Sequence, residues 1–297
     1  MRDMIVYLFV FLMSLFFKRN MQLHLRKFDL SQIEEGRNVL LIAKRGSGKS
    51  TIILDILYNK RDIPIGTVIC PTETSNGTYS KHVPSLFIHT EYSPQLVANV
   101  LKRQNKIIKK MNKEIATYGK SSIDPRAFLV MDDMMFDDSW KKDKNIKYIF
   151  ANGRHEKLNF ILSLQYLKGI GPSFRSNSDY IFILRENMIS NRKLIYETFA
   201  GIFPSFEMFC TVLDQLTENH ECMVIDNTSL SNKLEDQVYW FKAEIHEDFK
   251  IGCKEFWMIH NELGGHSDNE DEEEMFDISK VVVKKKNSPQ INVRKTY

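Results

Sequence analysis

The sequence feature that most constrains the fold is an apolar run that ends in a glycine-rich turn, between Asn38 and Thr51. Val39–Ile42 are four consecutive apolar residues without polar alternation, which is typical of a strand buried on both faces of a parallel sheet. Residues 43–50 follow the pattern G-x-x-x-x-G-K-[ST] except at the first position, where Ala43 replaces glycine. An amphipathic helical pattern comes next, with apolar residues at Ile52, Ile53, Ile56 and Leu57. The order of strand, loop and helix therefore predicts a phosphate-binding loop.

This loop predicts the binding of a nucleoside triphosphate together with Mg²⁺. Gly46 and Gly48 let backbone N–H groups curl around an anion, and the following helix adds the positive end of its dipole. We expect Lys49 to reach the β- and γ-phosphates and Ser50 to ligate Mg²⁺. The predicted nucleotide-binding residues are Ala43, Lys44, Arg45, Gly46, Ser47, Gly48, Lys49, Ser50 and Thr51.

Length and composition indicate one globular domain with tails. The chain has 297 residues, of which 43% are hydrophobic and 27% charged, as in ordinary globular proteins. We expect an apolar leader at 1–20, a nucleotide-binding domain at 21–262 and a tail at 263–297. The tail begins with six acids in seven residues (268–274) and later carries a lysine run, which predicts disorder.

The leader leaves three interpretations open. Met4 to Phe17 is fourteen residues with one polar member, shorter than the roughly 20 that a membrane-spanning helix needs. It is an inert leader created by a start codon upstream of Met21, a membrane-associating anchor, or the core of a signal peptide. No small-residue cleavage site follows it.

Cysteine spacing and net charge bear on the cellular compartment and on a nucleic-acid partner. The four cysteines have no C-x-x-C spacing, so neither a zinc site nor a disulfide framework is indicated, and a reducing compartment fits best. A net charge of +3 is too small to indicate a nucleic-acid partner by itself. Any such partner must be inferred from where the charges lie.

The segment from Pro94 to Tyr118 has helical periodicity with a basic side. Leu101, Ile107, Ile108, Met111 and Ile115 are expected to lie on its apolar side. The opposite arc is expected to carry Lys102, Arg103, Lys106, Lys109, Lys110 and Lys113. This arc is a candidate track for the phosphate backbone of double-stranded DNA, or an ordinary solvated helix face.

A second chemical motif follows the apolar strand predicted at 127–131. Two carboxylates, Asp132 and Asp133, end this strand about 80 residues after the loop. Asp132 is expected to hold the Mg²⁺ shell, and Asp133 to polarise the attacking water. Because the two motifs occur in the same chain, each strengthens the interpretation of the other.

Polar side chains also mark the ends of neighbouring predicted elements. The strand beginning at Asn159 ends with Ser163 and Gln165, and Gln165 either senses the γ-phosphate or only caps the strand. Arg154, on a loop after a basic segment, either offers its guanidinium to a neighbour's nucleotide or pairs with a nearby acid. A strand at 66–70 ends in the polar loop Thr72–Gly77, which is either part of the site or a surface turn.

Five motifs together resemble the genome-packaging ATPases of large nucleocytoplasmic DNA viruses, the poxvirus-type branch of the HerA–FtsK superfamily. They are Ala43–Ser50, Leu129–Asp133, Asn152–His155, Ile161–Gln165 and Arg175–Asn177. The element Asn-x-Arg-His followed by a strand ending in Gln is the most particular of these. The likeness covers about residues 22 to 245.

The resemblance implies an α/β fold of the ASCE, RecA-like P-loop type, with a mostly parallel central sheet and helices on both faces. It implies Mg-ATP bound by Lys49 and Ser50, metal held by Asp132, catalysis by Asp133, a sensor at Gln165 and a finger in trans at Arg154. Asp133 stands where many relatives carry Glu. A homo-oligomeric ring that threads double-stranded DNA into a capsid follows by analogy, with a capsid or portal partner. The implied location is the host cytoplasm at virus assembly sites, or the virion itself.

Two other function classes remain as alternatives. A P-loop kinase for a nucleotide or other small molecule would need an arginine-rich lid and an acceptor-binding acid, whereas the Gln-tipped strand and the Asp-Asp pair favour an ATPase. A scaffold that binds nucleotide without hydrolysing it would not need Lys49, Asp132, Asp133 and Gln165 together.

Overall fold

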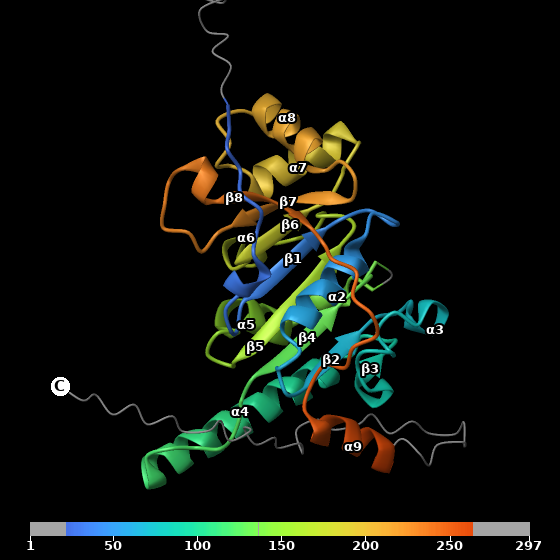
Figure 1. The fold of residues 1–297 in the computed structure, drawn as a ribbon, viewed down its shortest axis with the longest axis vertical. Helices are drawn as coiled ribbons and strands as arrows, with labels where there is room; N and C mark the ends of the chain where they lie inside the picture. Colours follow the sequence, from blue (N-terminus) through green and yellow to red (C-terminus); the bar gives the residue numbers. More distant parts are fainter. Residues whose placement is uncertain (1–21, 136, 264–297) are drawn as a thin grey trace, which may run out of the picture.

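The computed structural model of the protein describes residues 22–135 and 137–263. Within these residues the centre is one eight-stranded sheet with the order β3-β2-β4-β5-β1-β6-β7-β8 (Figure 1). Neighbouring strands from β3 to β6 in this order are parallel, whereas β7 and β8 are antiparallel. The strands are β1 Asn38–Ile42, β2 Gly66–Ile69, β3 Ile88–His89, β4 Ala127–Met131, β5 Leu158–Leu164, β6 Tyr180–Ile183, β7 Glu221–Asp226 and β8 Val238–Lys242.

This topology confirms the predicted fold class. The strand of the phosphate-binding loop, β1, does not pair with β4, which carries the two acids. Instead β5 lies between them, pairing in parallel with both. This extra strand between the two motif-bearing strands is the arrangement expected of an ASCE-type sheet.

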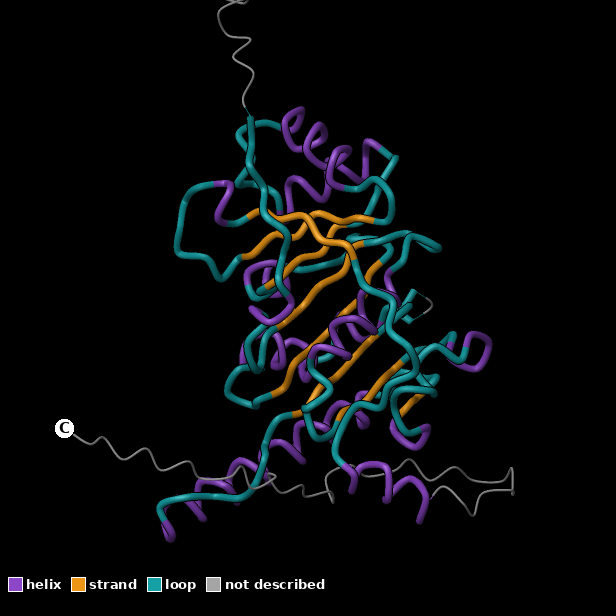
Figure 2. The backbone as a smooth tube through the Cα atoms, in the orientation of Figure 1, coloured by secondary structure: helices purple, strands orange, loops and turns teal. Residues whose placement is uncertain are grey.

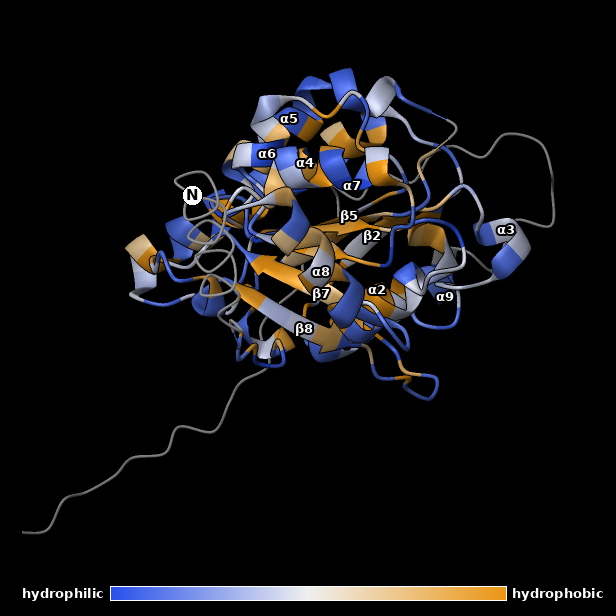
Figure 3. Cartoon of the chain, turned by 90° about the horizontal axis from the view of Figure 1, so that it is seen from above, coloured by the Kyte–Doolittle hydropathy of each residue, from blue (hydrophilic) through white to orange (hydrophobic). Residues whose placement is uncertain are grey.

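The central strands form because their side chains are apolar on both faces. All residues of β1, β4 and β5 are buried. Burying one large aliphatic side chain contributes about 1.5–3 kcal/mol, so a covered parallel sheet is the stable arrangement for these runs. Figure 3 shows the hydrophobic strands between layers of helices whose outer sides are polar.

Helices cover both faces of the sheet. In Figures 1 and 3, α2 lies on one face and α4, α5 and α6 lie on the other, while α7 and α8 sit toward the β7 end. The helices are α2 Lys49–Asn59, α3 Glu73–Asn76, α4 Pro94–Tyr118, α5 Lys144–Asn152, α6 Pro172–Ser176, α7 Ile189–Phe199, α8 Phe206–Leu216 and α9 Lys254–Leu263. None of the helices between residues 22 and 263 is long and apolar enough to cross a membrane.

Most predicted elements occur within one or two residues of their predicted bounds. The helix predicted from Pro94 to Tyr118 has those ends, because Ser93 caps its first turn and Gly119, with φ of 72°, ends it in the left-handed conformation. The short strand predicted near residues 85–90 is a 3₁₀ turn followed by the two residues of β3. The predicted leader lies outside the described residues, as does nearly all of the predicted tail.

A C-terminal strap, residues 243–253, returns from β8 across α2 to α9 (Figure 2). It is bound to Asp55 of α2, a buried carboxylate that accepts the N–H of Glu244 at 2.8 Å and a bond from Nε2 of His246 at 2.7 Å. The His246 ring also stacks on Tyr58, with 3.6 Å between ring centroids. The strap therefore fixes the end of the domain to the helix of the phosphate-binding loop.

Candidate active site

Five of the predicted site residues meet at one edge of the sheet. Lys49 and Ser50 begin α2, Asp132 and Asp133 follow β4, and Gln165 follows β5. Because β1, β4 and β5 are parallel, their carboxyl ends share this edge, as the binding crevice of an open α/β sheet requires.

The phosphate-binding loop has the conformation that its glycines allow. Gly46 and Gly48 have φ of 76° and 98°, and a Cβ on either would meet no atom within 4 Å. The glycines are thus required by backbone conformation, and the space above the loop is free for a ligand. Ala43, the departure from the motif, is buried and donates its N–H to the carbonyl of Leu164 at 2.9 Å. It therefore extends the pairing of β1 before the loop begins.

Asp132 is buried and its carboxylate is held by three hydroxyl groups. Its Oδ2 accepts from Ser50 Oγ at 3.1 Å and from Tyr79 OH at 2.8 Å, and its Oδ1 accepts from Ser163 Oγ. These bonds offset the desolvation of a buried carboxylate. Hydroxyl and carboxylate oxygens are also the ligands that Mg²⁺ prefers. Ser50 and Asp132, already in contact, therefore fit a magnesium ion.

Asp133 turns out of the strand direction toward the loop. Its φ of 56° is left-handed, an uncommon conformation for a residue with a side chain. Its N–H donates to Ser163 Oγ at 3.1 Å, and its Oδ1 lies 3.2 Å from Lys49 Nζ and contacts Gln165 Nε2. A cavity of about 750 Å³ opens beside Asp133 and Gln165, on the side away from the phosphate-binding loop, toward Trp140 and α7. Asp133 therefore lies between the phosphate-binding loop and this cavity.

Tyr79, which contacts Asp132, was missed by the sequence analysis, and Glu73 was named only as part of the loop Thr72–Gly77. Tyr79 comes from the segment after α3, and the carboxylate of Glu73 accepts the N–H groups that fix this segment. The loop Thr72–Gly77, for which a site and a surface turn were both open, contains Glu73 and leads to Tyr79. The signal available in the sequence was its position after the carboxyl end of a strand.

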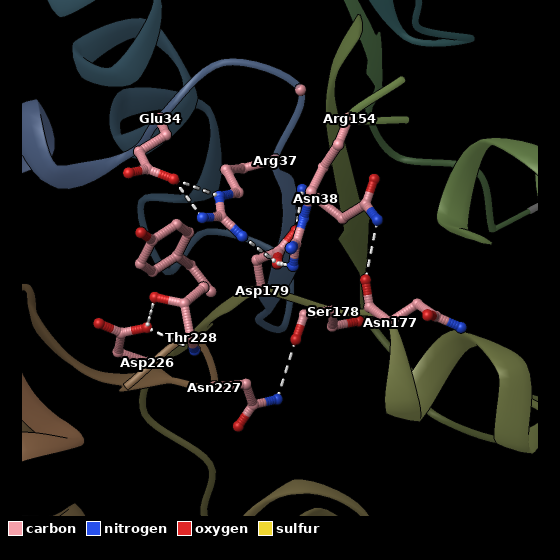
Figure 4. Close-up of polar contacts among 12 residues, drawn as sticks. Glu34, Arg37, Asn38, Arg154, Asn177, Ser178, Asp179, Asp226, Asn227 and Thr228 are labelled. Carbon is pink, nitrogen blue, oxygen red and sulfur yellow. Dashed lines mark hydrogen bonds and ion pairs between the residues drawn. The ribbon is translucent and has the colours of Figure 1, made fainter. Parts of the chain in front are cut away.

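Arg154 lies at the opposite edge of the sheet, where β1, β5 and β6 begin (Figure 4). Its Nη2 is 2.6 Å from Oδ1 of Asp179, and 62% of its side chain is exposed. The structure therefore does not bring Arg154 to the acids of its own chain. It forms the ion pair with a nearby acid that was one of the two predicted alternatives.

Asp179 connects Arg154 to the start of β1. The same carboxylate accepts from Arg37 Nη1 at 3.1 Å and from the N–H of Asn38 at 2.8 Å. Burial by itself would lower the pKa of Arg37, but the bond to Glu34 and the charge of Asp179 raise it. Arg37 therefore stays a cation at this buried end of the strand.

Two of the motifs behind the family resemblance line one polar cavity of about 280 Å³. Arg154 and His155 contribute from one loop, and Ser176 and Asn177 from the end of α6. Asn38 joins them, because its Nδ2 donates to the carbonyls of Phe150 and Asn177. Asn38 Oδ1 is buried and has no hydrogen-bond partner within the part of the chain that the structure describes. The motifs Asn152–His155 and Arg175–Asn177, which are separate in the sequence, therefore line the same cavity.

The basic arc of α4 is smaller than predicted. Its five lysines are exposed: Lys102, Lys106, Lys109, Lys110 and Lys113. Arg103 is 0% exposed, so its assignment to this face was wrong. It lies three residues after Val100 and four before Ile107, both buried, which is the spacing of the apolar side. Ile115, predicted on the apolar side, is 44% exposed because the end of α4 extends beyond the sheet (Figure 1).

Comparisons with known proteins relate the chain to a family of viral proteins. The sequence model of the Poxvirus A32 protein family matches residues 26–250. An uncharacterised protein of Acanthamoeba polyphaga mimivirus is 41% identical over 237 residues, covering 80% of this chain and 82% of the relative. An uncharacterised protein of Invertebrate iridescent virus 6 is 39% identical over 225 residues, covering 74% and 83%.

Two solved structures are more distantly similar. The genome packaging NTPase B204 from Sulfolobus turreted icosahedral virus 2, in complex with ATP-gammaS, is 16% identical with a TM-score of 0.45, and covers 71% of this chain and 100% of that chain. The pCW3 conjugation coupling protein TcpA, with ATPgS, is 15% identical with a TM-score of 0.49, and covers 72% and 62%. On its family match and its viral relatives, the chain belongs to the poxvirus A32 protein family.

Proposed function

We propose that the protein hydrolyses ATP to move double-stranded DNA into a viral capsid. The observation that carries the proposal is the meeting of Lys49, Ser50, Asp132, Asp133 and Gln165 at one sheet edge, in a chain of the A32 family. Family membership does not favour a small-molecule kinase.

Each side chain has a distinct task in hydrolysis. Lys49 would exchange its contact with Asp133 for the β- and γ-phosphates of ATP, which frees the Asp133 carboxylate. Asp133 would then accept the proton of the attacking water while the water oxygen bonds to the γ-phosphorus and the bond from the γ-phosphorus to the bridging oxygen of ADP breaks. Gln165 would orient that water. Ser50 and Asp132 would hold Mg²⁺, which neutralises phosphate charge when bound.

In this proposal, the exposed lysines of α4 bind the DNA. One helix, whose sequence contains a single acidic residue, Glu114, carries Lys102, Lys106, Lys109, Lys110 and Lys113. Contacts from lysine to phosphates bind DNA of any sequence, as a packaging enzyme needs.

Ring assembly would bring Arg154 to the nucleotide of a neighbouring subunit. Its exposure and its distance from its own phosphate loop support a role in trans. Such a finger neutralises charge in the transition state and makes hydrolysis depend on the neighbour.

Further proposals are a capsid or portal partner, a location at virus assembly sites in the host cytoplasm or in the virion, and membrane association through residues 4–17.

The test is ATP hydrolysis by the full chain with and without long duplex DNA. We expect DNA to stimulate hydrolysis in the wild type and not in Lys49→Ala. Hydrolysis that is indifferent to DNA at every salt concentration and assembly state would overturn the proposal, and phosphate transfer to a small acceptor would favour a kinase.

A further inference from the structure

Tyr79 contacts the metal-side carboxylate from outside both sequence motifs. It is 0% exposed and lies in the segment between α3 and β3. Its hydroxyl donates to Oδ2 of Asp132 at 2.8 Å, the oxygen that also accepts from Ser50 Oγ. A buried residue from a segment outside both motifs thus contacts the carboxylate at the centre of the nucleotide site.

The backbone of Tyr79 is fixed from two sides. On one side the carboxylate of Glu73 accepts the N–H groups of Thr78, Tyr79 and Ser80 at 2.8–3.1 Å. Glu73 is only 7% exposed, so these bonds are shielded from water. The tyrosine cannot easily move away from Asp132.

On the other side, the next residues connect Tyr79 to the C-terminal strap. The carbonyl of Tyr79 accepts from the N–H groups of His82 and Val83 at 2.9 and 2.8 Å. The carbonyl of His82 in turn accepts the N–H of Ile251 at 3.0 Å. The strap that fixes α2 therefore also fixes the Tyr79 segment.

The hydroxyl of Tyr79 donates its hydrogen to Asp132, because the oxygens of a carboxylate can only accept. When Ser50 turns its oxygen toward a cation, it stops donating to Asp132. Tyr79 and Ser163 then remain, one on each carboxylate oxygen, and together they fix the rotation of the carboxylate.

We propose that Tyr79 is a positioning residue that orients Asp132 for magnesium, and that Glu73 holds Tyr79 in place for this task. The inference rests on the proposed function, because it concerns the same ATP site. Side chains that orient a metal ligand typically change metal affinity or activity by about 10- to 100-fold when they are lost.

The experiment measures Mn²⁺ binding to the full chain by electron paramagnetic resonance, with a non-hydrolysable ATP analogue at saturation. Tyr79→Phe keeps the ring and removes only the hydroxyl, and we expect it to raise the apparent Kd for Mn²⁺ about tenfold. Analogue affinity in EDTA should not change. Tyr239→Phe is the matched control, since this buried tyrosine donates to the carbonyl of Asp236 far from the site.

A double-mutant cycle separates positioning from packing. In an Asp132→Asn background, Tyr79→Phe should have little further effect on Mn²⁺ binding, because residues that act through one another are not additive. If Tyr79→Phe fails to fold, Glu73→Gln, which weakens the backbone clamp and keeps the hydroxyl, should shift the Kd in the same direction by less.

Wild-type Mn²⁺ affinity in Tyr79→Phe, or in Glu73→Gln where the first variant does not fold, would overturn the inference. So would equal effects of Tyr79→Phe with and without Asp132. These outcomes leave DNA-stimulated hydrolysis by the wild type untouched. Conversely, a shifted Mn²⁺ affinity without any DNA stimulation would overturn the proposed function alone.

Discussion

Arg154 Nη2 lies 2.6 Å from Asp179 Oδ1, at the edge of the sheet opposite to the phosphate-binding loop. Because most of the Arg154 side chain is exposed, water screens this ion pair, and such pairs contribute little stability. Asp179 would keep Arg37 and the N–H of Asn38 if Arg154 left. The guanidinium can therefore move to a phosphate on another molecule without leaving a buried charge unpaired.

This relationship leads to the first prediction, for mixtures of wild-type and Arg154→Ala subunits. If Arg154 acts in trans, one defective subunit also disables its neighbour, so DNA-stimulated ATPase activity should fall more than in proportion to the mutant fraction. The pure variant should lose about 1,000-fold or more in kcat. Lys147→Ala removes an exposed cation of α5 and is the control. A linear loss of activity across the mixtures would contradict a finger in trans.

The second prediction concerns Asp133→Asn. The amide keeps the size of the side chain but cannot accept the proton of the attacking water, so kcat should fall about 100-fold or more. Nucleotide binding should remain, because Lys49 and the loop glycines are intact. Single-turnover hydrolysis and equilibrium binding of labelled ATP measure the two effects. Equal losses in binding and in hydrolysis would mean that Asp133 acts mainly by arranging the loop.

The third prediction tests the lysines of α4. Replacing Lys106 and Lys110 with glutamine should weaken binding to duplex DNA equally for all sequences. The slope of log affinity against log salt should fall by about one for each lost phosphate contact. Arg103→Met is the matched control, since it removes a cation of the same helix that is buried and cannot reach DNA. An unchanged salt slope in the lysine variant would mean that this face is only solvated.

The fourth prediction is that Arg103→Met stabilises the protein. Nε and Nη2 of Arg103 are buried and have no hydrogen-bond partner among residues 22–135 and 137–263, and burial lowers the pKa of Arg103 to about 10. Replacing a buried, poorly paired charge with an apolar side chain of similar length commonly stabilises by about 1 kcal/mol or more. Urea unfolding measures the change. A loss of stability would show that the guanidinium has partners in the folded protein.

The fifth prediction concerns pH. Burial lowers the pKa of His89 from 6.5 to about 4, so between these values the unfolded chain binds a proton that the folded chain does not. Protonation of His89 in the unfolded chain therefore lowers the free energy of unfolding as pH falls from 6.5 toward 4. Above pH 6.5 the imidazole is neutral in both states, and this loss of stability is absent. His89→Gln should flatten this part of the stability profile, measured by urea unfolding at several pH values. A profile identical to the wild type would contradict the shift.

Local patterns in the sequence were sufficient for the elements that position the site. The apolar run of β1, the glycines of the loop and the caps of α4 each specify a conformation within a few residues. The meeting of Lys49, Asp132 and Gln165 was also predictable, because parallel strands bring their carboxyl ends to one edge.

Contacts between distant polar residues were not predictable in this way. Tyr79 reaches Asp132 across 53 residues of sequence and Arg154 reaches Asp179 across 25. In sequence each of them is one polar residue in a loop, which is the usual composition of a surface. Arg103 shows a different error: a long helix can bury a cation on its apolar side when neighbouring segments cover it, and residue type alone then misleads.

The strap across α2 lies outside the sequence motifs, but α2 depends on its contacts. A protein shortened after Lys242 would keep every strand of the sheet and every motif of the site. It would nevertheless take from Asp55, inside the helix that begins with Lys49, the two donors that Glu244 and His246 supply, and leave this carboxylate with only the side chain of Asn59. The minimal catalytic unit therefore extends beyond the last strand.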